Sequence, residues 1–377
     1  MSKCNLCGSV NLRLAASPFD VYVSSDCTPV VAETDFYECL DCGGVGKPLT
    51  PEWKTTVADL YERYNIYHQS DGGEQKSFDA SGEASTRSDM LVHNIFEQHK
   101  LSETGSVLDI GCGNGAFLTA FEKVRRDWKF FGNDLGTKFK SNIEAISANA
   151  TFLEGAFQNI SGQFDLVSLV HCLEHLENPT DALRKVGDLL APGGILFIEV
   201  PDVERNAFDL LIFDHCTHFA KPTLHQALAD AGFGEIEIAT DWHSKELSAV
   251  ARFVGGAKER PPSPSQDVLG SGLAWLTDLK NQSTKVSKDV STTVGIFGTS
   301  IAATWLKAIM GDEAAFFVDE DLSRTGRTLF DIPVYSPDQV PPDASVLLPF
   351  PPTIAAVIAK RFERSLSTVQ PTPEALN

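Results

Sequence analysis

The stretch Val107-Leu-Asp-Ile-Gly-Cys-Gly-Asn-Gly115 decides the fold of this chain. An apolar run leads into a turn with glycines at 111, 113 and 115, and the residues that follow, 116–124, have the pattern of a helix. Glycine lets the backbone approach a ligand closely, because a Cβ atom at these positions would intrude. The unpaired N–H groups at the start of the helix attract a negatively charged group. The stretch therefore predicts a strand, a ligand-binding turn and a helix.

The glycine spacing and two acidic residues narrow the choice of ligand. The glycine spacing is Gly-x-Gly-x-Gly, whereas dinucleotide sites favour Gly-x-Gly-x-x-Gly. Asp109 lies in the strand before the turn, where it would repel a pyrophosphate but could pair with an ammonium group. Asp134 follows the next predicted strand, where a carboxylate can accept hydrogen bonds from both hydroxyls of a ribose. These features favour a cofactor with an ammonium group and a ribose over an ordinary turn without a cofactor.

Apolar segments alternate with helical ones between residues 101 and 245, which is typical of a parallel sheet covered by helices. Helices are also expected before this region, from Pro51 to Tyr67 and from Asp89 to His99, and after it, over 301–310. We expect the strands of the sheet at residues 106–110, 129–133, 165–169, 194–200 and 235–239.

With these elements in place, the chain resembles the class I S-adenosylmethionine-dependent methyltransferases over about residues 86–240. Besides the glycine turn and Asp134, the likeness is carried by Phe164-Asp-Leu-Val-Ser-Leu-Val-His-Cys-Leu-Glu-His175 and by Leu189-Leu-Ala-Pro-Gly-Gly-Ile-Leu-Phe-Ile198. Such enzymes often hold adenine with an Asp after the third strand, which Glu154-Gly-Ala-Phe157 lacks, so we expect Phe157 to stack on adenine instead. The resemblance implies that S-adenosylmethionine is bound by Asp109, Gly111, Gly113, Gly115, Asp134, Leu135, Phe157, His171 and His175.

Two cysteine pairs, Cys4-x-x-Cys7 and Cys39-x-x-Cys42, precede this domain. Each pair can give two thiolates to a tetrahedral ion, and four thiolates with no open position are typical of structural zinc. The alternatives are unmetallated core cysteines and redox use of one pair. The sequence thus predicts a small zinc-binding module that is closed by a long hairpin.

The segment Phe208-Asp-Leu-Leu-Ile-Phe-Asp-His-Cys-Thr-His-Phe219 follows the strand that ends at Val200. Asp214, His215 and His218 cluster there, beyond the carboxyl edge of the sheet, where ligands bind in open α/β folds. We therefore expect these three residues to be catalytic. The alternatives are packed histidines at the start of a helix, and a second metal site made by this segment.

The order of zinc module, methyltransferase domain and C-terminal α/β domain resembles the sugar C-methyltransferases. Their C-terminal domain is matched by Val294-Gly-Ile-Phe-Gly, Phe317-Val-Asp-Glu-Asp321 and Ile332-Pro-Val-Tyr-Ser-Pro337. The resemblance implies methylation of carbon 3 of a nucleotide-linked 4-keto-6-deoxy sugar.

The pattern of that family, Tyr-x-Glu-His-x-x-Tyr-Phe, is here Ile212-x-Asp-His-x-x-His-Phe219. The resemblance implies that His215 removes the proton beside the ketone and that Asp214 orients it. Both tyrosines are lost, so either His218 replaces them in stabilising the enolate or the acceptor is different. O- or N-methylation of a small metabolite, and a non-catalytic protein that binds the cofactor, are the alternative functions.

The composition limits the partners. The 31 basic and 51 acidic residues give a formal net charge of −20, which opposes binding to nucleic acids and to anionic membranes. We find no secretory signal and no apolar run of about 20 residues, and the cysteine pattern fits a reducing compartment. We therefore expect a cytoplasmic protein whose acceptor is a small molecule.

These features predict an α/β chain of several units. The expected units are a zinc-binding module at 1–50, a helical linker at 51–100, the methyltransferase domain at 101–255, a linker and helix at 256–291, a smaller Rossmann-like domain at 292–367 and a disordered tail at 368–377.

Overall fold

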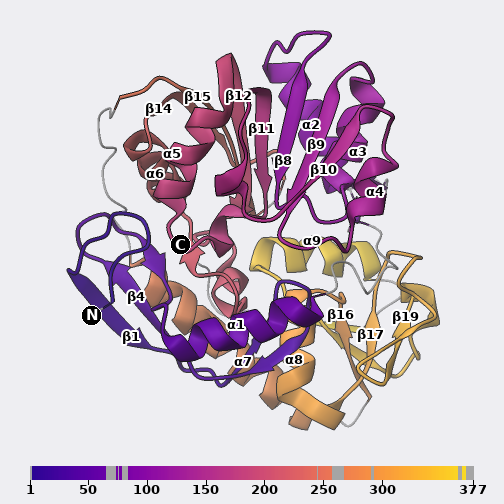
Figure 1. Ribbon diagram of the computed structural model, residues 1–377. Coiled ribbons are helices and arrows are strands. Elements are labelled where there is room, and N and C mark those ends of the chain that lie inside the picture. Colours follow the sequence, from indigo (N-terminus) through magenta and orange to yellow (C-terminus); the bar gives the residue numbers. More distant parts are fainter. Residues whose placement is uncertain are drawn as a thin grey trace.

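The computed structural model describes residues 2–64, 74, 76–78, 84–243, 245–256, 267–289, 293–363 and 367–370. It confirms the predicted α/β class. A large mixed sheet forms the upper part of the molecule, and the N-terminal and C-terminal segments together form the lower part (Figure 1). The predicted helix end at Tyr67 lies outside the described residues, as do residues 257–266 of the predicted linker and helix at 256–291.

The large sheet has seven strands in the order β10-β9-β8-β11-β12-β15-β14. The strands from β10 to β12 run parallel, and β15 runs antiparallel to both of its neighbours. The strands are β8 (Ser106–Ile110), β9 (Lys129–Asp134), β10 (Ala150–Glu154), β11 (Phe164–Val170), β12 (Leu190–Pro201), β14 (Phe233–Ala239) and β15 (Glu246–Phe253).

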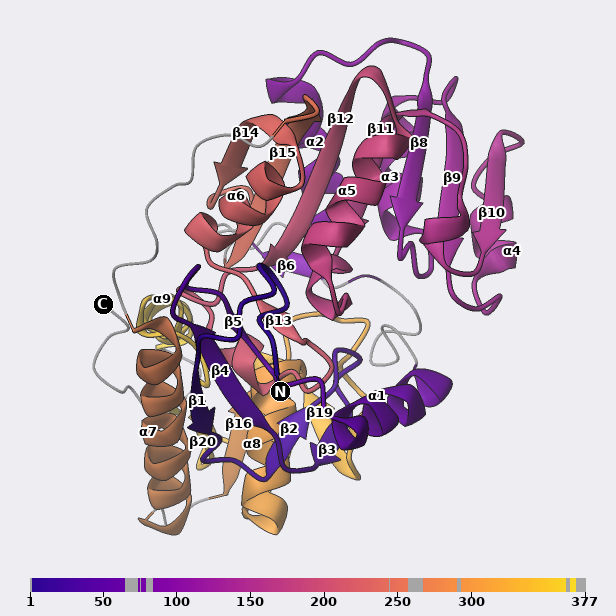
Figure 2. The ribbon, with the colours of Figure 1, turned by 60° about the vertical axis from the view of Figure 1, so that its left-hand side comes forward.

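Helices cover both faces of this sheet (Figure 2). Successive residues alternate between two cores, because side chains along a strand point to opposite faces. In β8, for example, Val107 packs with one core and Leu108 with the other. One core includes residues of α5 (Pro179–Leu189) and α6 (Lys221–Asp230), and the other includes residues of α2 (Arg87–Gln98) and α3 (Ala116–Val124). A short helix, α4 (Lys140–Glu144), lies beside β10.

The N-terminal sheet takes its last strand from the segment that follows β12. Its strand order is β1-β4-β5-β13, and the hairpin β2–β3 lies between β1 and β4 in sequence. A single helix, α1 (Pro51–Arg63), follows. The strands are β1 (Leu12–Ala16), β2 (Val21–Val23), β3 (Pro29–Val31), β4 (Asp35–Cys39), β5 (Val45–Gly46) and β13 (Thr217–His218).

The C-terminal sheet has the order β18-β19-β17-β16-β20-β21. Its last strand includes Thr368 and Val369, which pair with β20, so the predicted disordered tail does not begin at residue 368. The elements are β16 (Val294–Phe297), α8 (Ile301–Met310), β17 (Ala314–Val318), β18 (Thr328–Leu329), β19 (Ile332–Tyr335), β20 (Ser345–Leu347), α9 (Pro352–Phe362) and β21 (Ser367–Val369). A separate two-stranded ribbon, β6 (Lys76–Phe78) and β7 (Ala84–Thr86), precedes α2.

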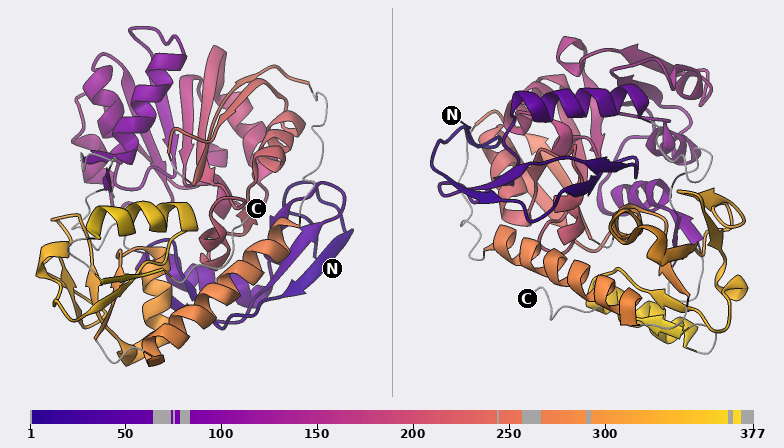
Figure 3. Two further views of the ribbon diagram at one scale, coloured as in Figure 1. Left: turned by 180° about the vertical axis from the view of Figure 1, so that it is seen from behind. Right: turned by 90° about the horizontal axis from the view of Figure 1, so that it is seen from below.

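A long helix, α7 (Val268–Asp289), lies in the lower part of the molecule and falls within the predicted linker and helix at 256–291 (Figure 3). It packs against α8 and against the segment 207–211. None of the described helices combines the length and the apolar composition that crossing a membrane requires.

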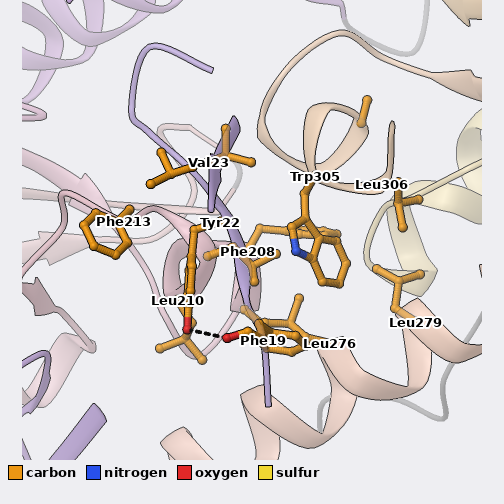
Figure 4. Close-up of a cluster of buried hydrophobic side chains, with 14 of the residues drawn as sticks. Phe19, Tyr22, Val23, Phe208, Leu210, Phe213, Leu276, Leu279, Trp305 and Leu306 are labelled. Atoms are coloured by element: carbon orange, nitrogen blue, oxygen red, sulfur yellow. Dashed lines mark hydrogen bonds between the residues drawn. The ribbon is translucent and has the colours of Figure 1, made fainter. Parts of the chain in front are cut away.

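One hydrophobic core joins the N-terminal module, the segment after β12 and the C-terminal domain (Figure 4). The rings of Phe19 and Trp305 meet edge to face, with centroids 5.5 Å apart. The indole N–H of Trp305 also donates to the backbone oxygen of Val21 at 3.0 Å. Residues far apart in the sequence thus hold the segment after β12, which includes His215, in a fixed place.

Candidate active site

A cleft of about 320 Å³ lies where the parts of the chain meet. The glycine turn lines one side of it, and the segment after β12 lines another. The C-terminal domain contributes the start of α8 and the buried side chain of Arg324. The carboxyl edge of the large sheet therefore faces a site to which all three regions contribute.

The glycine turn needs glycine for two measurable reasons. Gly111, Gly113 and Gly115 all have positive φ angles, of 71°, 50° and 84°, which residues with a Cβ rarely adopt. A Cβ on Gly111 would also lie 2.7 Å from the sulfur of Cys172, and one on Gly115 would lie 2.6 Å from Ile143. The turn is thus shaped as a cradle, as its sequence predicts.

Asp134 lies at the end of β9 and is tied to the glycine turn. Its Oδ2 accepts from the N–H of Gly113 at 3.1 Å, and its Oδ1 accepts from the N–H of Leu135 at 2.7 Å. Leu135 is 69% exposed beside it. The carboxylate therefore faces the cleft from a rigid position, which suits binding of ribose hydroxyls.

Asp109 lines the same cleft but is only 2% exposed. Burial raises its pKa to about 7, against the opposing effect of the hydroxyl of Ser168, which donates to it at 2.8 Å. The charge of Asp134 raises the pKa further. Asp109 therefore carries a carboxyl group that a bound ammonium group can ionise.

Phe157 does not reach the cleft. It begins a short 3-10 turn, Phe157–Asn159, and its side chain is 5% exposed within the core on the α5 side of the sheet. This position corrects the expectation that Phe157 stacks on adenine, since a ring packed in the core cannot also cover a ligand.

His171 and His175 both line the cleft. His171 follows β11 with a φ angle of 50°, and its Nδ1 lies 3.2 Å from Oε1 of Glu174. The ring of His175 packs perpendicular to that of His215, with centroids 4.6 Å apart. The two histidines expected beside the cofactor thus belong to the same cluster as the candidate base.

His215 is oriented by Asp209 and not by its neighbour Asp214. Its Nδ1 lies 2.6 Å from Oδ1 of Asp209, which belongs to the 3-10 turn Ala207–Leu211. Asp214 instead accepts from the N–H and hydroxyl of Ser25, at 2.8 and 2.5 Å, and faces Nδ1 of His175 at 3.5 Å. The expected role of Asp214 is therefore corrected: it positions His175.

His218 lies behind the cleft and does not line it within the described part of the chain. Its Nδ1 lies 2.6 Å from Oδ2 of Asp209, and its Nε2 lies 3.3 Å from Nζ of Lys47. Burial lowers its pKa to about 4. With both ring nitrogens occupied, His218 cannot replace a missing tyrosine, which corrects that expectation.

Asp209 binds both histidines at once, and they stabilise its charge. Burial alone would raise its pKa, but the hydrogen bonds that it accepts from His215 and His218 hold that pKa below the ordinary value. Lys47 completes this network: its Nζ donates to the backbone oxygens of Ile212 and His215 at 2.6 and 2.9 Å. Lys47 of the N-terminal module thus holds the histidine segment, residues 209–218, in place.

The four cysteines of the two pairs come together at the end of that module. Their sulfur atoms lie within 4.8 Å of one another, and those of Cys4 and Cys42, and of Cys7 and Cys39, are 3.6 Å apart. Tetrahedral zinc with bonds of about 2.3 Å places its sulfur ligands about 3.8 Å apart. The two separations of 3.6 Å are close to this spacing.

Sequence reasoning missed four residues of the site. Glu174 and Asp209 lie in the segments 164–175 and 208–219, but neither was predicted to belong to the site. No motif near Lys47 indicated a functional role. Tyr64 ends α1 and brings a phenol group to the cleft. A buried histidine requires a hydrogen-bond partner for its ring N–H. This requirement was the available indication that an acidic residue such as Asp209 lies beside His215.

Comparisons with known proteins agree with this geometry. A family model described as a methyltransferase domain matches residues 85–237. The C-methyltransferase NovU of Streptomyces niveus is 24% identical over 300 residues, which cover 68% of this chain and 69% of NovU. A ubiquinone biosynthesis O-methyltransferase of Psychrobacter arcticus is 30% identical over 175 residues, which cover 38% of this chain and 65% of that enzyme.

Among solved structures, the CurJ carbon methyltransferase matches 45% of this chain and 54% of its own, with 16% identity and a TM-score of 0.38. A likeness at that level does not establish a shared function. The chain spans about half to two thirds of the length of the ubiquinone enzymes that it matches. The family match and the curated relatives identify residues 85–237 as the catalytic domain of an S-adenosylmethionine-dependent methyltransferase.

Proposed function

We propose that the protein transfers the methyl group of S-adenosylmethionine to a small-molecule acceptor in the cleft. The observation that carries this proposal is that His215 shares the cleft with the glycine turn, while Asp209 holds its Nδ1. A carboxylate accepts the Nδ1–H, so the neutral ring keeps its lone pair on Nε2. A histidine held in this way can take a proton from the acceptor.

The cofactor would be held by the glycine turn and two carboxylates. Asp134 would accept from the ribose hydroxyls, and Asp109 would pair with the ammonium group. The start of α3 would face the carboxylate of the cofactor, and Leu135 would give an apolar contact. When bound, the cofactor supplies a methyl group whose carbon–sulfur bond breaks with the electron pair remaining on sulfur.

We infer that the acceptor is a nucleotide-linked keto-deoxy sugar that is methylated on carbon. His215 would take the proton from the carbon beside the ketone, that carbon would then bond to the methyl group, and His215 would release its proton to solvent. The hydroxyl of Tyr64 lines the cleft and could donate to the enolate oxygen. The identity with NovU over 300 residues supports carbon as the methylated atom.

Methylation of oxygen is the second candidate. The relatives in ubiquinone biosynthesis are O-methyltransferases, and the match with one reaches 30% identity. In that reaction the cleft would place a hydroxyl next to the methyl group, and a histidine would take the hydroxyl proton. Deuterium from solvent appearing on the acceptor carbon would support the first candidate, and its absence during turnover would support the second.

We also propose that Cys4, Cys7, Cys39 and Cys42 bind structural zinc. The sulfur separations support this proposal, and four thiolates leave no position open for catalysis. Metal analysis of the purified protein should give one zinc per chain. Changing Cys39 to Ser should remove it.

Calorimetric titration tests the acceptor class. The protein would be saturated with S-adenosylhomocysteine and then titrated with thymidine, uridine, guanosine and cytidine diphosphates. Selective micromolar binding of one nucleotide is expected for a nucleotide-linked acceptor. If none binds, the acceptor carries no nucleotide, and free sugars and other small metabolites become the substrates to test.

A further inference from the structure

Three side chains converge beside the cleft, which two of them line, in an arrangement that could hold a metal ion. Glu174, His175 and His215 each offer a ligand atom, and these atoms lie within 4.8 Å of one another. Two atoms bound in tetrahedral directions to one ion at about 2.1 Å lie about 3.4 Å apart. Side-chain movements of up to about 1.4 Å would therefore close the site around an ion.

The hydrogen bonds of the two histidines indicate which nitrogen can bind. Nδ1 of His175 lies 3.0 Å from the hydroxyl of Tyr61, which can donate or accept, and 3.2 Å from the backbone oxygen of Asp214, which can only accept. A hydrogen on this Nδ1 is the arrangement that satisfies the backbone oxygen. Nδ1 of His215 faces the carboxylate of Asp209. With both hydrogens on Nδ1, the lone pairs lie on Nε2. Holding the other ring nitrogen with a carboxylate or a backbone carbonyl is how proteins orient metal-binding histidines.

Glu174 supplies the second, independent observation. Its side chain is 1% exposed, and Oε1 is paired with His171. Its Oε2 is buried and has no hydrogen-bond partner among the described residues. A buried carboxylate oxygen without a partner is costly, and a cation beside it would remove that cost.

The charge around the cluster favours a cation as well. Asp209, Asp214 and Glu174 are all buried within hydrogen-bonding or ion-pair distance of a histidine. The buried Lys47 directs its Nζ to backbone oxygens and to His218, not to these carboxylates. Positive charge next to Glu174 would balance carboxylates that have been removed from water.

We propose that Glu174, His175 and His215 bind a divalent first-row transition-metal ion, distinct from the zinc proposed at the cysteines. Two imidazoles and one carboxylate suit such ions. Three protein ligands also leave positions open to the cleft, as in catalytic sites. The ion would place positive charge beside an acceptor oxygen, where the tyrosines of the family pattern are missing.

The inference rests on the proposed function in placing the acceptor in this cleft, and it replaces the role of His215 as the proton acceptor, because Nε2 cannot bind a cation and take a proton at the same time. With the ion bound, His171 remains as a proton acceptor. Its Nε2 is buried without a partner among the described residues, and its ring lines the cleft.

Binding of Mn²⁺ to untagged protein with its zinc in place tests the proposal. Mn²⁺ suits carboxylate ligands such as Glu174 and does not compete with zinc for thiolates. The decrease of the free Mn²⁺ signal in electron paramagnetic resonance measures how much is bound, and we expect one ion per chain. Pulsed measurements should show that the bound ion is coupled to imidazole nitrogen. Glu174→Gln and His215→Ala should weaken binding at least tenfold. His93→Ala, which removes an exposed histidine of α2, should leave binding unchanged.

The unmodified protein already gives a decisive result, so an unfolded variant cannot obscure it. Binding that shows no imidazole coupling would overturn the proposal, as would a lack of Mn²⁺ binding at millimolar concentration. Equal affinity of a folded Glu174→Gln variant would do the same. None of these readouts needs an acceptor, so failure of the metal site is distinct from failure of the proposed methyl transfer.

Discussion

Asp209 organises the site without standing out in the sequence. Its two oxygens hold the Nδ1 atoms of His215 and His218, both at 2.6 Å. Asp214 is the obvious partner in the sequence because it is adjacent to His215, but its carboxylate binds Ser25 and faces His175. Adjacency in a loop says little about side-chain direction, so this partner could not be predicted without the path of the backbone.

The cofactor turn was predictable because its parts are local. Gly111, Gly113 and Asp134 lie on one strand–turn–helix–strand unit, whose geometry is the same wherever it occurs. Phe157 was not predictable, because the same short turn can direct a ring to the core or to the ligand. The packing of the core decides between these directions.

The raised pKa of Asp109 should make cofactor binding depend on pH. Its pKa of about 7 lies above the ordinary value of 3.8 because it is buried. The folded chain thus holds this proton more tightly than the unfolded chain. The stabilisation is complete below pH 3.8 and is lost as the pH rises through about 7. A bound ammonium group favours the ionised form, so affinity for S-adenosylhomocysteine should increase as the pH rises toward 7.

Calorimetry at several pH values measures this dependence. Asp109→Asn cannot ionise, so its affinity should be weaker and nearly constant over the same range. A wild-type affinity that does not change with pH would contradict the assigned role of Asp109, and so would an Asn variant that keeps the dependence.

At the level of elements, the strands with a clear apolar pattern were predicted within a few residues. β8 was predicted with its observed bounds, and β12 only lacked its first residues and Pro201. β15 was missed, since it carries buried polar residues, Glu246 and Ser248, that interrupt the apolar pattern. Their burial depends on β12, where Glu199 accepts from the hydroxyl of Ser248. Such pairing is not visible in either strand alone.

The short pairing of β5 with β13 joins the cysteine module to the histidine segment, and Lys47 extends it. Lys47→Met should leave the backbone oxygen of His215 without its Nζ donor, which costs about 1–3 kcal/mol. The backbone oxygen of Ile212 also loses Nζ but keeps the N–H of His215 at 3.3 Å. The free energy of unfolding, measured in urea, should fall by about 2 kcal/mol or more.

Lys54→Met is the matched control for that substitution. Lys54 is exposed and pairs with Glu177 at the surface, so its loss should change the free energy of unfolding by less than about 1 kcal/mol. Equal effects of the two substitutions would show that Lys47 does not clamp the histidine segment.

At the scale of the whole molecule, the N-terminal and C-terminal regions act as one unit because they share a core. This shared core could not be predicted from the sequence. Contacts such as that between Phe19 and Trp305 join residues that no local pattern connects. The packing explains how distant segments build one cleft.

Trp305→Ala should therefore destabilise both ends of the chain together. Removing a fully buried tryptophan costs about 3–5 kcal/mol, and the hydrogen bond to Val21 is lost as well. Hydrogen exchange should increase in β2 and in α8 alike. Leu322→Ala, at a position 79% exposed, should change neither. Faster exchange in α8 alone would mean that the two regions are stabilised independently.

Calorimetric titration with S-adenosylhomocysteine tests the central claim most directly. The account predicts one molecule bound per chain, at least tenfold weaker binding by Asp134→Ala, and unchanged binding by Asp127→Ala, which removes an exposed carboxylate. A folded wild-type protein that does not bind would contradict the account, as would an Asp134→Ala variant that binds as tightly as the wild type.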